Sequence, residues 1–149
     1  MTTFKIGQLT LLLLSLCLAA CSAQAQSGTV PESYQGATPH SPDFLTDAAN
    51  LEAGQKLYRQ HCATCHGETG RGDGLAGHTL ALKPANLADP RGVVQKPLDY
   101  WFWRVSEGGT AEPFHSKGSV MPAWKHHLST EERWQVIAFT RSLALAAAK

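Results

Sequence analysis

The sequence is poor in several kinds of residue, and each shortage excludes a class of protein. Only 17% of its 149 residues are charged, the formal net charge is +1, and no basic stripe interleaves arginines with aromatic side chains. Binding to nucleic acid phosphates needs such a stripe. We therefore expect no nucleic-acid partner. No pattern typical of β-strands is evident either, which argues against folds built on a sheet.

A long hydrophobic run is also missing. The most apolar segment, residues 6–20, has 15 residues, whereas a membrane-spanning helix needs roughly 20. Lys5 precedes this segment and Leu-Ala-Ala-Cys ends it at Cys21. The pattern predicts a lipoprotein-type signal peptide over residues 1–20, with cleavage before Cys21 and lipid on its thiol. The alternatives are ordinary cleavage near Ala23 or Ala25, or an uncleaved short anchor. We expect an exported protein, lipid-anchored on the periplasmic side of a bacterial membrane.

Cysteine is scarce once this segment is set aside. Cys17 falls in the removed signal and Cys21 carries the lipid, so Cys62 and Cys65 are the two that remain. No spare pair is left for a structural disulfide. Removal of Lys5 also leaves twelve basic and twelve acidic residues, which makes the formal net charge of the mature chain zero.

The remaining chain divides into a polar segment and a folded domain. Residues 21–42, rich in Ser, Gln, Gly, Ala and Pro, are predicted to be a lipid-anchored flexible tether, with Tyr34 as a surface residue. Residues 43–149 form the domain. Helical periodicity predicts helices over 50–65, with Asn50 as N-cap, over 97–107, and after a Ser129–Glu132 capping box. The prediction is a small all-α fold of three to five helices with long loops.

Residues 61–67, "HCATCHG", carry the strongest motif. A thioredoxin-like pair would need a βαβ pattern, and a zinc site would need a second ligand cluster. The third interpretation is covalent c-type haem, for which C-x-x-C-H is the attachment signature. Cysteines three apart on a helical turn can bond the two vinyl groups along one porphyrin edge, and His66 then places an imidazole under the iron. We expect haem c, attached to Cys62 and Cys65 and ligated by His66.

The sixth iron ligand is predicted to be Met121. It is the single methionine left after Met1 is removed, and it lies in a polar loop before Pro122, which restricts it to extended conformations. A lone methionine is otherwise more often a core residue. The rival ligands are histidines: His61, His78, His115, His126 and His127.

These motifs in this order resemble a class I monohaem cytochrome c of the bacterial exported type, over about residues 47–145. "HCATCHG", the helix with Gly54 and Tyr58, "MPAW" and the aromatic-bearing last helix carry the resemblance. It implies that Gly54 and Tyr58 meet Phe139 where the first and last helices cross. It also implies that the Pro84 carbonyl accepts a hydrogen bond from His66 Nδ1.

The resemblance gives roles to other residues as well. Trp101, Trp103 and Trp124 are expected to line the pocket around the porphyrin. Alternatively, Trp124 and Arg104 reach the haem propionates.

The function expected is single-electron transfer between redox proteins, without enzymatic activity and without a small-molecule substrate. Two axial ligands would leave the iron no open position for substrate. The alternatives are an electron-relay subunit of a larger oxidoreductase and a peroxidase-like or gas-binding haem protein, which needs an open sixth position.

Overall fold

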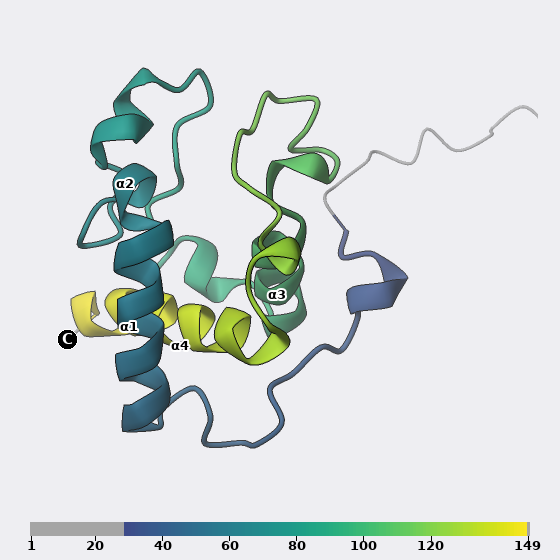
Figure 1. The fold of residues 1–149 in the computed structure, drawn as a ribbon, viewed down its shortest axis with the longest axis vertical. Coiled ribbons are helices and arrows are strands. Elements are labelled where there is room, and N and C mark those ends of the chain that lie inside the picture. The colour runs from purple at the N-terminus through teal and green to yellow at the C-terminus, as the bar shows by residue number, and fades with distance from the viewer. Residues whose placement is uncertain (1–28, 149) are drawn as a thin grey trace, which may run out of the picture.

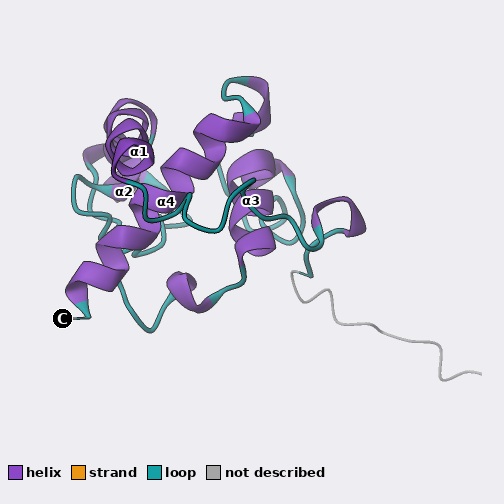
Figure 2. Cartoon of the chain, turned by 90° about the horizontal axis from the view of Figure 1, so that it is seen from below, coloured by secondary structure: helices purple, strands orange, loops and turns teal. Residues whose placement is uncertain are grey.

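The computed structural model describes residues 29–148, and within this range it contains helices and loops but no strand (Figures 1 and 2). The predicted all-α fold is therefore confirmed. None of the helices in this range has the length and apolar character needed to cross a membrane. The α-helices are α1 (Ala48–His61), α2 (Ala63–His66), α3 (Leu98–Glu107) and α4 (Thr130–Ala147). Short 3₁₀ helices are η1 (Glu32–Tyr34), η2 (Leu75–Thr79), η3 (Val93–Gln95), η4 (Gly108–Thr110) and η5 (Trp124–His126).

The first and last long helices cross at a steep angle, with α1 vertical and α4 behind it in Figure 1. Gly54 lies at the crossing, where an added Cβ atom would be 1.9 Å from the Gln135 carbonyl oxygen. The rings of Tyr58 and Phe139 meet beside it, with centroids 5.3 Å apart. The predicted contact of Gly54 and Tyr58 with Phe139 is thus confirmed. Glycine costs a helix roughly 0.5–1 kcal/mol, and here that cost permits the close approach.

The main apolar core lies where α3 packs against α4. Phe102 and Trp134 stack at 4.5 Å between ring centroids, and Ile137 is fully buried beside them. Of the two predicted iron ligands, His66 is the last residue of the short helix α2, and Met121 lies in the loop between η4 and η5. A short helix and a loop, and not the long helices, therefore carry the predicted ligands (Figure 1).

The helix ends follow local capping signals, with one correction. The Ser129–Glu132 capping box begins α4 as predicted. The N-cap of α1 is Asp47, whose carboxylate accepts from the Asn50 N–H at 2.9 Å, and not Asn50 itself. Asn50 instead bonds to Phe44 and, across the helix crossing, to Gln135. Gly108 ends α3 at a positive φ of 55°, a conformation that favours glycine.

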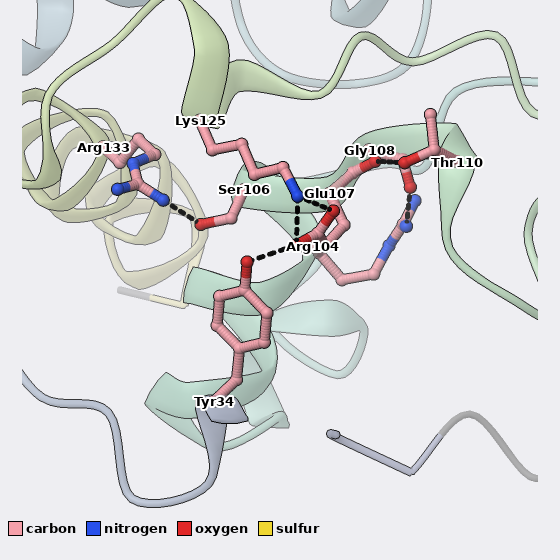
Figure 3. Close-up of polar contacts among 8 residues, drawn as sticks. All are labelled: Tyr34, Arg104, Ser106, Glu107, Gly108, Thr110, Lys125 and Arg133. Atoms are coloured by element: carbon pink, nitrogen blue, oxygen red, sulfur yellow. Dashed lines mark hydrogen bonds and ion pairs between the residues drawn. The ribbon is translucent and has the colours of Figure 1, made fainter. Parts of the chain in front are cut away.

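Part of the segment expected to be a flexible tether lies against the domain. Tyr34 packs at 6.1 Å from the ring of Phe102, and its hydroxyl donates to the Glu107 carboxylate (Figure 3). The Gly36 N–H donates to Asp99 at 3.1 Å. The composition of the segment did not predict these contacts, because the ring and the hydroxyl of a single residue, Tyr34, make most of them. We call residues 30–42 the strap. The predicted signal peptide and Cys21 lie outside the described residues.

Candidate haem-binding site

The C-x-x-C-H motif forms the short helix α2, which continues from α1 after a change of direction. The Cys62 N–H still bonds to the Tyr58 carbonyl at 2.8 Å, and the His66 N–H bonds to the Cys62 carbonyl at 2.9 Å. Both cysteines are partly buried and unbridged. Burial, with a smaller effect from Cys65, raises the pKa of the Cys62 thiol to about 12. The motif therefore presents two thiols and an imidazole from a single turn.

The glycine-rich loop after the motif wraps back onto α2. The N–H groups of Gly72 and Gly74 donate to the carbonyls of His66 and Cys65, at 2.8 and 3.2 Å. A Cβ atom at Gly74 would lie 2.5 Å from the Thr64 oxygen. Glycine is thus required where the loop presses on the helix. These backbone contacts hold α2 in place without using its cysteine or histidine side chains.

His66 is oriented by a backbone carbonyl from the far end of that loop. Its Nδ1 lies 3.2 Å from the oxygen of Ala85, so the prediction of Pro84 was wrong by one residue. The Pro84 carbonyl instead faces Gly72. Burial lowers the pKa of His66, the bond to Ala85 opposes this, and the Arg104 charge lowers it further. The neutral form with Nδ1–H bonded leaves Nε2 as the lone-pair nitrogen for a metal.

Met121 is held at the C-terminal end of α3. Its carbonyl accepts from the Gly109 N–H at 2.7 Å. Its sulfur lies 3.9 Å from an Arg104 guanidinium nitrogen. The charge of Arg104 also lowers the pKa of His66.

Two of the rival histidines have surface contacts of their own. His115 is exposed and faces Glu112 at 3.5 Å. His61 packs against the ring of Trp124. Among residues 29–148, no group of three or more His, Cys, Asp and Glu side chains lies close enough to hold a metal ion.

The tryptophans divide into two kinds. Trp101 and Trp103 are buried, and among the described atoms their indole N–H groups have no hydrogen-bond partner. An orphaned buried donor is costly unless an acceptor arrives. Trp124 lies half-buried beside His61. Arg104 donates to the Gly108 carbonyl (Figure 3) and stacks over the Phe114 ring.

Sequence reasoning missed Ala85, Gly108 and Gly109 as parts of this site. A backbone carbonyl acceptor such as that of Ala85 leaves no signature in residue type. The Gly108–Gly109 pair follows the last residue of α3 directly, and Gly108 caps that helix. The contact of this glycine pair with the Met121 segment depends on the tertiary fold, and the spacing of residues in the sequence does not predict it.

Comparison with known proteins agrees with this geometry. A solved structure titled as the reducing HAO-like protein complex of Kuenenia stuttgartiensis is similar, with a TM-score of 0.54 and 25% sequence identity. The similarity covers 65% of this chain and 44% of that one, so this chain matches less than half of its relative. The family model described as cytochrome c oxidase, cbb3-type, subunit III matches residues 49–139. This range contains the C-x-x-C-H motif, the loop to Ala85, and Met121. The chain therefore belongs to this family and is a c-type cytochrome domain.

Proposed function

We propose that this chain is a single-electron carrier with one haem c bonded to Cys62 and Cys65. His66 and Met121 would ligate its iron. The observation that carries the proposal is the His66 ring, held neutral by burial and oriented by the Ala85 carbonyl, on the same turn as two free thiols. Family membership supports haem-based electron transfer.

The residues present fit such a group. The two unpartnered indole N–H groups of Trp101 and Trp103 suit acceptors such as carboxylate oxygens. Cys62 and Cys65 would hold the haem through thioether bonds to its two vinyl groups. When bound, haem supplies a one-electron ferric–ferrous couple.

The role of the protein is to hold the haem in place and to enclose it. Ala85 keeps the His66 ring in one tautomer and orientation. The Met121 thioether would be the second protein ligand of the iron, and thioether ligation would favour the ferrous state and leave no open position for a substrate. A closed position favours electron carriage over the peroxidase-like or gas-binding alternative.

The second candidate is an electron-relay subunit of a larger oxidoreductase. The family description is that of an oxidase subunit, and the similar solved structure belongs to a complex. The exposed apolar side chains of Leu75, at the start of η2, and Val120, in the loop before Met121, suit contact with a redox partner. Co-purification from solubilised membranes separates the candidates, because a relay subunit stays with its complex and a free carrier does not.

For location we propose export and a lipid anchor on Cys21, with residues 1–20 removed. A carbonate wash of membranes tests this. Anchored cytochrome stays in the pellet, and a Cys21→Ser variant cleaved as an ordinary signal becomes soluble. Wild-type cytochrome found wholly in the wash would contradict the anchor.

The covalent attachment is tested by replacing both cysteines. Cys62→Ser/Cys65→Ser protein should lose all its haem on acid–acetone extraction, whereas wild-type protein keeps it. The reduced wild-type protein should also refuse CO. Haem that remains bonded to the double variant would rule out this attachment.

A further inference from the structure

The segment around Met121 makes unusually close backbone contact with the turn that ends α3. A Cβ atom at Gly108 would lie 2.4 Å from the Met121 carbonyl oxygen and 2.1 Å from that of Pro122. One at Gly109 would lie 2.3 Å from the Ser119 carbonyl oxygen. Distances this short force the neighbouring backbone to move, since packed interiors have little room to yield. Any side chain at either glycine would therefore displace the Met121 segment.

The same turn also bonds to that segment. The Gly109 N–H donates to the Met121 carbonyl at 2.7 Å. The Arg104 guanidinium, one turn earlier on α3, donates to the Gly108 carbonyl, and its other terminal nitrogen lies 3.9 Å from the Met121 sulfur. The guanidinium carbon also lies over the ring of Phe114, 3.4 Å from the ring centroid. Main chain and side chain of Met121 are thus both fixed from α3.

We propose that Gly108, Gly109 and Arg104 form a seat that positions the Met121 thioether for the haem iron. The proposal rests on the proposed function, in which Met121 is the sixth ligand. The two glycines set how close the Met121 backbone lies to α3, and Arg104 orients the thioether. They are positioning residues, and their loss should weaken the iron–sulfur bond while the haem stays attached.

Gly109→Ala is the central variant because Gly109 has no positive φ, so its substitution adds a collision without backbone strain. Gly118→Ala is the matched control. Gly118 lies in the loop before Met121 with φ at +75° and nothing within 4 Å of an added Cβ, so its substitution adds strain without collision. Met121→Ala defines complete loss of the ligand.

The measurements are the far-red sulfur-to-iron absorption band of the oxidised protein and the rate of CO binding by the reduced protein. Both are made well below the melting temperature on covalently loaded protein. Gly109→Ala should weaken the band and bind CO, which the wild-type protein does not bind. Gly118→Ala should match wild type. A substitution that only lowers the stability of the fold would change neither the absorption band nor the rate of CO binding.

Gly109→Ala protein that keeps the band and refuses CO would overturn the proposal. So would a Gly118→Ala variant that opens the iron equally. If Gly109→Ala yields no folded cytochrome, Arg104→Gln decides, because it removes the guanidinium without a collision: faster CO binding supports the seat and wild-type behaviour overturns it. If Met121→Ala itself matches wild type, the assignment of Met121 as ligand has failed, which is a separate result.

Discussion

At the scale of single residues, Met121 and His66 are held by very different means. His66 sits on a helix turn and is oriented by one carbonyl, whereas Met121 lies in a loop and depends on its contacts with α3. A histidine within the attachment motif is tied to its position by two neighbouring covalent bonds in the proposed haem protein. The methionine has no such constraint. We therefore expect that substitutions on the Met121 side of the site can expose the iron to other ligands.

Met121→Ala tests this difference. Loss of the thioether should lower the reduction potential by about 60 mV or more, the equivalent of a tenfold loss of preference for ferrous iron. The reduced variant should also bind CO. Potentiometric titration and CO difference spectra measure both. A variant whose potential and CO behaviour equal those of wild type would transfer the role to a histidine, with His115 and His126 the next to replace.

The residues of the candidate site differ in how far sequence could reveal them. Cys62, Cys65 and His66 are readable because covalent attachment requires a fixed local spacing. Met121 was inferred from its rarity and from Pro122. The acceptor for His66 was misplaced by one residue because carbonyl oxygens are chemically alike along a loop. The contact of Gly109 with Ser119 joins a helix end to a separate loop segment, and local patterns do not report such contacts.

At the scale of elements, the crossing of α1 and α4 organises the domain. The crossing was expected from the resemblance to class I cytochromes c, and a glycine inside the helix, where it is unfavourable, agrees with a close neighbour. The start of α1 was misread by three residues, since Asp47 and Asn50 are equally good caps in sequence. The stacked rings of Phe102 and Trp134 hold α3 against α4, one of the two crossing helices.

Gly54→Ala should therefore destabilise the protein, although the same substitution in a solvent-exposed helix is stabilising. The new methyl group meets the Gln135 carbonyl at 1.9 Å, and forced repacking typically costs about 1–3 kcal/mol. Chemical denaturation of the loaded protein measures the loss. Gln60→Ala, on the exposed end of α1, should change stability by less than about 0.5 kcal/mol. Equal stability of Gly54→Ala and wild type would contradict the close crossing.

At the scale of the whole molecule, the strap joins the N-terminal segment to the end of α3. Glu107 is the junction, since its carboxylate accepts from the Tyr34 hydroxyl and pairs with Lys125 at 2.8 Å (Figure 3). Lys125 follows the Met121 loop by four residues. Arg133 donates to Ser106 beside this junction. Strap, α3 and the segment after Met121 thus share one carboxylate.

Glu107→Gln should release part of this junction in a pH-dependent way. Partial burial raises the pKa of Glu107, but hydrogen bonds from Lys125 and Tyr34 outweigh it and leave the pKa below its usual value. A carboxyl with a lowered folded-state pKa stabilises the protein fully above its unfolded-state pKa, and the effect is lost as pH falls through the folded-state value. The variant should be less stable than wild type by about 1 kcal/mol at pH 7.

Melting curves from pH 7 to pH 3 test this. The difference between the variant and wild type should shrink on acidification below about pH 4.5. Glu32→Gln is the control, because Glu32 is exposed on the same strap. A difference that stays constant across this range would show that the ionised carboxylate of Glu107 is not what holds the junction.

The docked strap also limits how much membrane the cytochrome can explore. With lipid on Cys21 as proposed, a free tether over residues 22–42 would extend to about 70 Å. Because residues 30–42 lie on the domain, only eight residues separate them from Cys21, and eight residues span at most about 28 Å. The disc of membrane swept around the anchor scales with the square of this radius and shrinks roughly sixfold. A cytochrome with so short a segment between its lipid anchor and its domain can serve only partners that lie directly beside it. It reaches more distant partners only by lateral diffusion of its lipid.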